Sequence, residues 1–358
     1  MVVINSSFLV QKLRGVNRYA VEISKELKLF MPDIKFIAPK TVIKNNYTEE
    51  INPEIYENKI KISTKQVTPW EQFELTTYLR QNKNPLLVNL TNTAPVFYKN
   101  QIITIHDLMF MRNPKWYTRK HYYFYKYLFN GIAQNSLKVI TVSECSKRDL
   151  IKYFNISENK IEIIHNAVSQ EFINLATANF ENKYGDYILA VSSLDPRKNF
   201  ERLIRAFNKL KLKNIKLVIV GDEGTLYKKE TFKYLIKDNP DVVFTGYVTD
   251  DELAGLYKNA KLFVFPSLYE GFGIPPLEAM ACNCPTIVSN AASIPEVCAD
   301  ASYYVDPNSI DSIAKGIYEV INDKTLQDEL RQKGAERVKK FSWEDSARKI
   351  AEIIKNIA

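Results

Sequence analysis

The sequence predicts an α/β protein made of two doubly wound, Rossmann-like domains. Short β-branched runs alternate with stretches of helical periodicity along most of the chain, which is typical of parallel sheets with helices on both faces. The length of 358 residues, with 46% hydrophobic and 25% charged residues, suits two folded domains better than a single core.

Strand-like runs and amphipathic stretches alternate through the first half of the chain. The expected strands are Val2–Ile4, Leu86–Leu90, Ile102–Ile105, Val139–Val142 and Ile161–Ile164. Apolar spacing predicts helices at Arg18–Phe30 and Lys147–Tyr153.

The second half repeats this alternation more regularly. Strands are expected at Tyr187–Val191, Leu217–Val220, Val242–Phe244, Leu262–Phe265, Thr286–Val288 and Tyr303–Val305. Helices are expected at Phe200–Leu210, Tyr227–Ile236, Asp250–Leu256, Pro276–Ala281, Ser309–Asn322, Leu326–Lys339 and Trp343–Ile357.

The domain boundary is expected in the polar segment Asn166–Tyr184, which has no clear period. We therefore divide the chain into an N-terminal domain, residues 1–168, and a C-terminal domain, residues 169–342. The last helix, residues 343–358, is expected to pack back on the N-terminal domain. Ligands of doubly wound domains bind outside the carboxyl ends of the strands, so the functional residues should follow strands and line a cleft between the domains.

Composition narrows the class of protein. A net charge of +8 indicates anionic partners such as nucleotides, membrane surfaces or nucleic acid, unless it only reflects a lysine-rich composition. The four cysteines form no Cys-x-x-Cys pair, three histidines are too few for an obvious zinc site, and no zinc-finger or RNA-recognition signature occurs. Met1–Ile4 leads straight into a strand-like run, with no basic n-region and no cleavage site, and no run approaches ~20 apolar residues, so a cytoplasmic location is expected.

The strongest functional signal lies in the segment Phe265–Met280. A glycine-rich loop follows an expected strand and leads into a helix in which Pro276 is an early residue. Backbone N–H groups at such a helix start suit an anion or a polyhydroxylated ligand. Gly271 and Gly273 allow a ligand to approach the backbone closely.

Two carboxylates belong to this segment. Glu270 lies in the loop and Glu278 in the first turn of the expected helix, and each could bind a pair of hydroxyls on one ligand. The alternative is an ordinary turn followed by a glutamate that complements the helix dipole.

A second loop, Val191–Phe200, also joins a strand to a helix and carries two adjacent cations. Arg197 and Lys198 suit a diphosphate, and fixed cations there would stabilise the charge that grows on a departing nucleotide. A solvated basic turn is the alternative. Two further loops, Gly221–Gly224 and Thr245–Val248, follow strands but are hard to distinguish from ordinary turns.

These segments resemble the signatures of the retaining glycosyltransferases of family 4, which have the GT-B fold: two Rossmann-like domains that face each other across a cleft. Glu270 and Glu278 match the family's Glu-x7-Glu spacing, within its Gly-Phe-Gly and Pro-Leu-Glu-Ala-Met framing. The Arg197-Lys198-Asn199 run matches the family's Arg-Lys-Asn/Gly motif. The resemblance covers essentially the whole chain and is more specific in the C-terminal half.

The resemblance implies a role for each of these residues. Glu270 would contact the donor sugar at its reacting face, Glu278 the ribose hydroxyls, and the backbone of Thr245–Val248 the nucleobase. The implied catalytic set is Glu270, His106, Arg197 and Lys198. The implied donor-binding set is Gly15, Ser192, Arg197, Lys198, Tyr247, Val248, Glu270, Phe272, Gly273, Ile274, Leu277 and Glu278.

The N-terminal half resembles the family less closely. Arg14–Tyr19 is similar to the family's glycine-rich loop but has only Gly15, and His106 stands where many members have a histidine beside the donor sugar. A structural histidine is the alternative. Trp70–Gln72 and Asn89–Asn92 resemble features of one bacterial subgroup and are expected to shape the acceptor side.

Two other matches concern structure more than chemistry. Ser143 begins a segment similar to a family helix start and is the expected N-cap. His165–Val168 stands where members often have Pro-Asn-Gly-Val, a change that affects hinge geometry.

The resemblance implies retaining transfer of a hexose, with mannose as the first candidate, from a GDP- or UDP-linked donor. The acceptor would be a saccharide or a lipid-linked saccharide in bacterial surface-polysaccharide assembly. No cofactor and no metal are expected, because no Asp-x-Asp motif occurs and Arg197 and Lys198 can supply the positive charge. A nucleotide-sugar epimerase with the same fold is one alternative. A basic nucleic-acid-binding protein is disfavoured by the two carboxylates.

The stretch Lys115–Asn130 combines aromatic and basic residues. A basic helix with aromatic side chains can lie on a membrane surface, which would suit a lipid-linked acceptor. The alternative is a core helix with solvated lysines. The residues concerned are Trp116, Tyr117, Arg119, Lys120, Tyr122, Tyr123, Phe124, Tyr125, Lys126, Tyr127 and Phe129.

Overall fold

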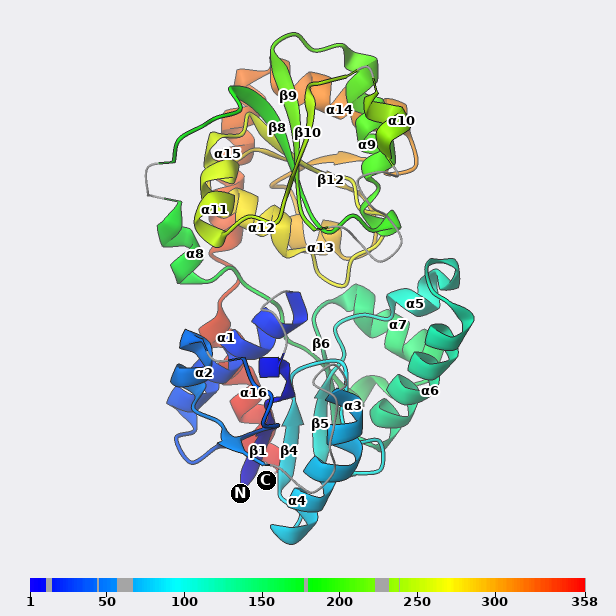
Figure 1. Ribbon diagram of the computed structural model, residues 1–358, viewed down its shortest axis with the longest axis vertical. Coiled ribbons are helices and arrows are strands. Elements are labelled where there is room, and N and C mark those ends of the chain that lie inside the picture. Colours follow the sequence, from blue (N-terminus) through cyan, green and yellow to red (C-terminus); the bar gives the residue numbers. More distant parts are fainter. Residues whose placement is uncertain are drawn as a thin grey trace. The chain divides into compact units, whose positions relative to one another are not determined.

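The computed structural model describes residues 1–10, 15–43, 45–56, 67–176, 180–222, 232–237 and 239–357. The chain forms two compact units (Figure 1): unit 1 comprises Met1–Asn166 and Trp343–Ala358, and unit 2 comprises Ala167–Ser342. Unit 1 therefore ends two residues before the expected boundary at residue 168, and the last helix is grouped with it.

Unit 1 contains a seven-stranded parallel sheet of order β3-β2-β1-β4-β5-β6-β7. All five expected strands are present, each within one residue of its expected start. The exposed, two-residue β3 is too short to show an alternating pattern in the sequence. The strands are β1 (Val2–Asn5), β2 (Lys35–Ala38), β3 (Glu54–Ile55), β4 (Leu86–Asn89), β5 (Gln101–Thr104), β6 (Lys138–Thr141) and β7 (Ile161–Ile163).

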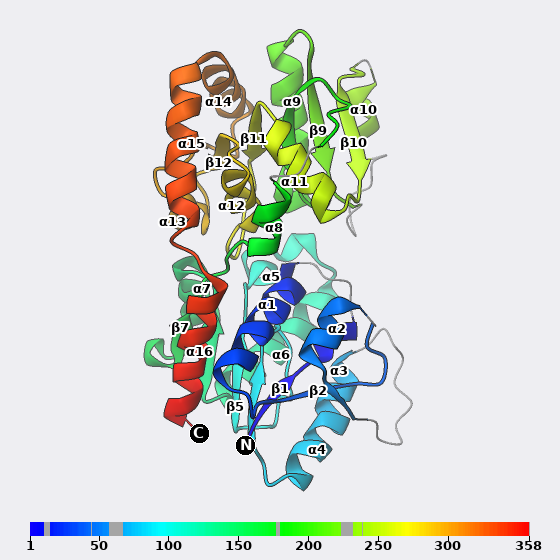
Figure 2. The ribbon, with the colours of Figure 1, turned by 90° about the vertical axis from the view of Figure 1, so that its left-hand side faces the viewer.

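Helices pack on both faces of this sheet. The last helix, α16, packs against α1 (Figure 2), while η2 and α4 bury Trp70 and Tyr78 against Val3 and Leu87 of the sheet. As expected, Ser143 caps α7 by accepting the N–H of Ser146 at 3.1 Å. The helices are η1 (Ser7–Val10), α1 (Gly15–Phe30), α2 (Asn46–Ile51), α3 (Val67–Pro69), the π-helical η2 (Trp70–Leu75), α4 (Thr76–Gln81), α5 (Met109–Arg112), η3 (Pro114–Trp116), α6 (Arg119–Asn135), α7 (Glu144–Phe154), η4 (Glu158–Lys160) and α16 (Trp343–Ile357).

Unit 2 contains a six-stranded parallel sheet of order β10-β9-β8-β11-β12-β13, and all six strands were expected. They are β8 (Asp186–Val191), β9 (Ile215–Val220), β10 (Val242–Gly246), β11 (Leu262–Phe265), β12 (Thr286–Ser289) and β13 (Tyr303–Val305). The helices are α8 (Gln170–Leu175), η5 (Pro196–Lys198), α9 (Phe200–Leu210), α10 (Lys233–Ile236), α11 (Asp250–Asn259), α12 (Ile274–Ala281), α13 (Ile294–Cys298), α14 (Ile310–Asn322) and α15 (Lys324–Val338). Residues 227–231 of the helix expected at Tyr227–Ile236 lie outside the described residues.

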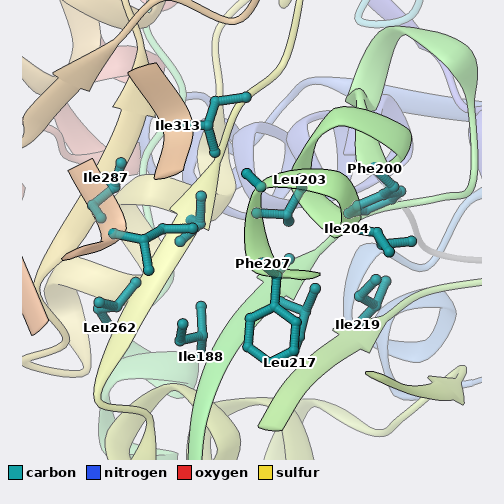
Figure 3. Close-up of a cluster of buried hydrophobic side chains, with 14 of the residues drawn as sticks. Ile188, Phe200, Leu203, Ile204, Phe207, Leu217, Ile219, Leu262, Ile287 and Ile313 are labelled. Carbon is teal, nitrogen blue, oxygen red and sulfur yellow. The ribbon is translucent and has the colours of Figure 1, made fainter. Parts of the chain in front are cut away.

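The core of unit 2 follows from the two-residue period of its strands. Ile188 of β8 and Leu217 of β9 point to the same face, where Leu203 and Phe207 of α9 and Ile313 of α14 cover them (Figure 3). Complete burial of each such side chain contributes about 1.5–3 kcal/mol to folding. This packing fixes α9 against the sheet, and with it the loop that precedes α9.

Candidate active site

The two loops with the strongest sequence signals meet in unit 2. One follows β8 and contains η5; the other follows β11. Because β8 and β11 are neighbours in a parallel sheet, their carboxyl ends place the two loops side by side. Arg197 Nη1 lies 2.9 Å from Glu270 Oε2, and Lys198 Nζ lies 2.7 Å from Glu270 Oε1.

Backbone and side-chain contacts hold the loops in this position. Asn199, between η5 and α9, has a φ of 63°, a left-handed conformation that asparagine tolerates better than most residues. Its Nδ2 donates to the carbonyl oxygens of Pro266 at 2.9 Å and Pro307 at 2.7 Å. The N–H of Leu268 donates to the carbonyl of Arg197 at 2.7 Å. The cations are therefore on a loop tied to the Glu270 loop.

The electrostatics of this group favour an anionic ligand. Lys198 and Glu270 are each only 7% exposed. Burial alone would raise the pKa of Glu270, but the charges of Lys198 and Arg197 outweigh it and hold that pKa below its usual value. Burial and the neighbouring Arg197 lower the pKa of Lys198 to about 8, although Glu270 opposes this. Two cations face this carboxylate in a largely desolvated site, and the charge of Asp195 also acts on Lys198.

The Glu270 loop is shaped by the start of the next helix, α13. Ser293 Oγ lies 2.9 Å from the carbonyl oxygen of Glu270 and 2.7 Å from that of Phe272. Gly273 has a φ of 107°, and a Cβ there would lie 2.5 Å from Ile294 Cδ1. The loop thus requires glycine at this position, and Ser293 fixes its carbonyls on one side.

Glu278 lies in the second turn of α12, so its expected position in the first turn was wrong. The helix begins at Ile274, because Gly273 forms its N-cap and Pro275 and Pro276 both fit its first turn. Glu278 is 8% exposed, and its Oε2 accepts the hydroxyl of Tyr257 at 3.1 Å. Burial first, and then the charge of Glu278, raise the pKa of Tyr257, which therefore stays a hydroxyl donor.

Other residues of the expected donor-binding set lie along the same sheet. Ser192 follows β8, and its N–H donates to Val220 at 2.9 Å. Thr245 and Gly246 belong to β10 itself, so that strand is two residues longer than expected, and the 68%-exposed Tyr247 comes after it.

Not all of these residues are near Glu270. Tyr247 and Val248 follow the edge strand β10, which β9 and β8 separate from β11. Ile274 begins α12 half-buried, and Leu277 is fully buried. Contact with a donor stays a prediction for these four residues, as it does for the rest of the expected donor-binding set.

The expected residues of the N-terminal half belong to unit 1. Gly15 is the exposed first residue of α1, with a φ of 38°, while Arg14 lies outside the described residues. His106 is 5% exposed, and its Nε2 lies 3.1 Å from the carbonyl oxygen of Leu90. Its ring meets that of Tyr19 edge-on with centroids 4.7 Å apart. Burial lowers the pKa of His106 to about 4, so the imidazole is neutral at pH 7.

Sequence reasoning placed Asn199 in a motif without giving it a role, and it missed two further supporting residues, Ser293 and Tyr257. Ser293 had a readable signal, since serine before an Ile-Pro helix start is typical of loop ends. Tyr257 had none, because its helical spacing is that of any core residue. Within the described ranges, no group of three or more His, Cys, Asp or Glu is arranged to hold a metal ion, and no helix is long and apolar enough to cross a membrane.

Two parallel sheets, one with cationic and carboxylate loops at its carboxyl ends, define a doubly wound α/β protein with a charged ligand site at that edge. Residues 174–341 match the family model described as glycosyl transferases group 1, and residues 13–172 match that described as glycosyltransferase family 4. The chain belongs to this family and is a glycosyltransferase. The resemblance inferred from Glu270, Glu278 and the Arg197–Lys198 pair is confirmed.

Relatives and solved structures agree with this assignment. The chain is 29% identical over 270 residues to the O-antigen chain mannosyltransferase B of Escherichia coli, covering 70% of each protein. It is 29% identical over 319 residues to the O-antigen chain mannosyltransferase RfbU of Salmonella typhimurium, covering 86% of this chain and 87% of that protein. Some longer relatives are matched over only about a third of their length, 31–32%.

The crystal structure of Anabaena HepE in complex with UDP and glucose superimposes with a TM-score of 0.75 at 17% identity, covering 99% of this chain and 100% of that one. The GT-B fold expected from the sequence is confirmed. Neither the epimerase nor the nucleic-acid-binding alternative is favoured by these relatives.

Proposed function

We propose that this glycosyltransferase moves a hexose, with mannose as the favoured sugar, from a GDP- or UDP-linked donor to a saccharide or lipid-linked saccharide acceptor. The process would be the cytoplasmic assembly of a surface polysaccharide. The observation that carries the donor class is the group of Arg197, Lys198 and Glu270, because two adjacent cations on the loop after β8 suit a diphosphate. The sugar and acceptor classes rest on the names of the two mannosyltransferase relatives.

The proposed reaction begins when the diphosphate competes with Glu270 for Arg197 and Lys198. Glu270 accepts from both cations, at 2.9 Å and 2.7 Å. A diphosphate carries more negative charge than one carboxylate and would compete for Arg197 and Lys198, which frees Glu270 to accept hydrogen bonds from the donor sugar. As the sugar–phosphate bond breaks, negative charge grows on the leaving diphosphate, and the fixed cations stabilise this transition state more than the ground state.

We propose front-face transfer with retention, in which the acceptor hydroxyl attacks from the side that the diphosphate leaves. The leaving phosphate would accept the hydroxyl proton. His106 is a poor candidate for that proton near neutral pH, since burial holds its pKa at about 4.

Product analysis tests this function. With GDP-mannose and a panel of octyl glycosides as acceptors, we expect an α-mannoside product by NMR spectroscopy, formed at the same rate in excess EDTA because Arg197 and Lys198 supply the charge on the diphosphate. A β-mannoside would contradict retention. Loss of activity in EDTA that Mg²⁺ or Mn²⁺ restores would contradict metal independence.

The pH dependence of kcat/KM should follow the protonation of the Lys198 amine. An amine is charged below its pKa, and this pKa lies at about 8 rather than at the ordinary 10.5. The charge needed by the diphosphate is therefore present at pH 7 and is lost as the pH rises through about 8. We expect kcat/KM for the donor to fall above that pH by about tenfold per unit. A profile that stays flat to pH 9.5 would contradict this role.

Peripheral contact with a membrane is a further part of the proposal. The inner residues of α6, including Phe129 and Ile132, are core residues, as the alternative of a core helix requires. Its outer side exposes aromatic rings, and further exposed rings lie on η2 and on the loop before β5. We define the aromatic face as Phe73, Phe97, Tyr123, Phe124 and Tyr127, exposed by 62%, 85%, 53%, 50% and 72%.

The segments that carry the aromatic face are in contact with one another. Val96 accepts the side chain of Asn135 of α6 at 2.9 Å, and its N–H donates to Gln72 Oε1 at 2.9 Å. Exposed Lys120 on α6 adds positive charge near these rings. Exposed aromatic side chains with nearby cations are typical of proteins that lie on anionic membrane surfaces.

Vesicle binding tests this contact. We expect the protein to sediment at low salt with vesicles that contain anionic phosphatidylglycerol and to be released by high salt. Phe97→Ala with Tyr127→Ala should weaken sedimentation, whereas Leu29→Ala, which removes a 74%-exposed leucine from α1, should not. No sedimentation of the unmodified protein at low salt would contradict membrane contact.

A further inference from the structure

The chain leaves unit 2 through a short segment that packs against the Glu270 loop. This segment follows α15, and the N–H of Phe341 donates to the carbonyl of Val338 at 3.1 Å. The ring of Phe341 meets that of Phe272 edge-on, with centroids 5.6 Å apart and an interplanar angle of 88°. Phe272 belongs to the Glu270 loop and is only 3% exposed. Because edge-on packing is a preferred geometry of aromatic pairs, Phe341 helps to fix this loop.

Arg337, near the end of α15, contacts both Phe341 and the helix α13. Its guanidinium carbon lies 5.0 Å from the centroid of the Phe341 ring. Its Nε donates to the carbonyl of Val297 at 2.7 Å, and its Nη2 donates to that of Glu296 at 2.5 Å. Both carbonyls belong to the last turn of α13, where a cation is favourable. Arg337 therefore fixes the C-terminal end of α13.

The other end of α13 contacts the same loop. Ser293, just before α13, donates its hydroxyl to the carbonyl oxygens of Glu270 and Phe272. Two separate routes therefore connect the end of α15 with the Glu270 loop. One runs from Phe341 to Phe272, and the other runs from Arg337 through α13.

The segment that carries Phe341 also joins the two units. Ser342 is the last residue of unit 2, and Trp343 is the first residue of α16 in unit 1. Trp343 is 6% exposed, and its ring meets that of Tyr19 of α1 edge-on with centroids 5.7 Å apart. Each unit thus holds one end of this segment with an aromatic ring. The Glu270 loop is supported by the same segment through which the chain passes between the units.

The position of the Glu270 loop matters because its contacts are short and specific. The carboxylate of Glu270 faces Arg197 at 2.9 Å and Lys198 at 2.7 Å, and both cations lie on a different loop. Groups that bind or react with a substrate must be held within about 0.5 Å of their productive geometry by the residues packed around them. A small shift of the Glu270 loop would therefore break the arrangement on which the donor site depends.

We propose that Phe341 and Arg337 are positioning residues of the donor site, which hold the Glu270 loop in place from the segment that joins the two units. This inference rests on the proposed function. Phe341 acts directly through Phe272, and Arg337 acts through α13. Neither residue touches the reacting atoms, so both act only through the position of Glu270.

Steady-state kinetics of Phe341→Ala test the direct route. The substitution removes the edge-on contact with Phe272, so the loop can shift, and a misplacement of about 1 Å costs about 10²-fold in rate. With GDP-mannose, or the UDP-sugar that the unmodified protein hydrolyses fastest, we expect kcat to fall about 10- to 100-fold. The donor KM should change less, because Glu270 and Lys198 act mainly on the transition state. Phe341→Tyr, which keeps the ring, should retain most of the unmodified kcat.

The pH profile gives a readout that a role in overall stability would not change. Burial and Arg197 lower the pKa of Lys198 to about 8, while Glu270 and Asp195 limit this fall. If the Glu270 loop shifts, Lys198 loses its neighbouring carboxylate and its pKa falls further. An amine is charged only below its pKa, so the charge would be lost at a lower pH. We therefore expect the alkaline fall of kcat/KM to begin at a lower pH in folded Phe341→Ala than in the unmodified protein.

Arg337→Met tests the route through α13. The substitution removes the bonds to the carbonyls of Glu296 and Val297 but leaves Ser293 in place. We expect kcat and the pH profile to change in the same direction as in Phe341→Ala, by a smaller factor. If Phe341→Ala does not fold, Arg337→Met carries the same test.

A matched control separates positioning from stability. Phe30→Ala removes a half-buried ring in unit 1 that lies 5.6 Å from the guanidinium of Arg348. It should lower the melting temperature and leave the donor kinetics unchanged. Unchanged kcat and pH profile in folded Phe341→Ala and Arg337→Met, or failure of both variants to fold, would overturn the positioning role alone. Absence of any donor turnover by the unmodified protein would overturn the proposed function, and this inference with it.

Discussion

Glu270→Gln is expected to lower kcat/KM for the nucleotide-sugar donor by about 10²- to 10³-fold. Glu270 is the one carboxylate that faces both Arg197 and Lys198 in the described site. Without its charge, the pKa of Lys198, about 8 with Glu270 in place, falls further. The buried amine then loses its proton near neutral pH. The variant would lose both the sugar contact of Glu270 and much of the positive charge for the diphosphate.

Steady-state kinetics on the folded variant check this result. Glu201→Gln is the matched control, because Glu201 pairs with Arg205 at 3.0 Å on the outside of α9 with its side chain 42% exposed. Exposed pairs of this kind contribute about 0–1 kcal/mol, so activity and stability should change little. If the Glu270→Gln variant kept nearly the kcat/KM of the unmodified protein, that result would contradict a role of Glu270 in the reaction.

Lys198→Met should cause a loss of similar size, with kcat falling more than the donor KM rises. Methionine keeps the apolar stem that packs near the ring of Phe265, 5.2 Å from the present ammonium group, but lacks the charge. That charge matters most when the diphosphate departs, so its removal acts mainly on the transition state, by about 10²- to 10³-fold. Arg197 alone would then face Glu270, whose pKa would rise toward its usual range.

Separate determination of kcat and KM tests this assignment. Lys209→Met is the control, since Lys209 pairs with Asp311 at 2.6 Å and its side chain is 58% exposed. A rise in KM with no change in kcat would mean that Lys198 binds substrate and transition state equally. That outcome would contradict its proposed role in stabilising the leaving group.

The sequence was most informative where local pattern and sheet topology agree. Strand-ending loops that carry Arg197, Lys198 and Glu270 could be placed at one edge of a parallel sheet, because strand alternation is a local property of the chain. The ion pairs among them could not be predicted, since they depend on which strands are neighbours: β11 follows β8 in space although β9 and β10 intervene in sequence.

Buried polar groups were harder to predict. Asn5 and Asn89 occupy positions of buried strands that normally hold apolar residues, and this departure was a readable signal of a polar cluster. Their partner Glu71, whose Oε1 accepts the side chain of Asn5 at 2.9 Å, lies on a π-helical turn that no periodicity in the sequence indicates. The turn of α12 that holds Glu278 was misplaced for a similar reason, because the exact helix start depends on the backbone of Gly273.

Turnover of a nucleotide-sugar panel by the unmodified protein and Glu270→Gln, side by side, tests the central claim most directly. GDP-mannose, UDP-glucose, UDP-galactose and UDP-N-acetylglucosamine would be compared by release of the nucleoside diphosphate and by thermal shift. The donor site described here predicts that the unmodified protein releases the diphosphate from at least one donor and that Glu270→Gln is slower by about 10²-fold or more. Equal release by the two proteins, or no binding and no release with any donor, would contradict it.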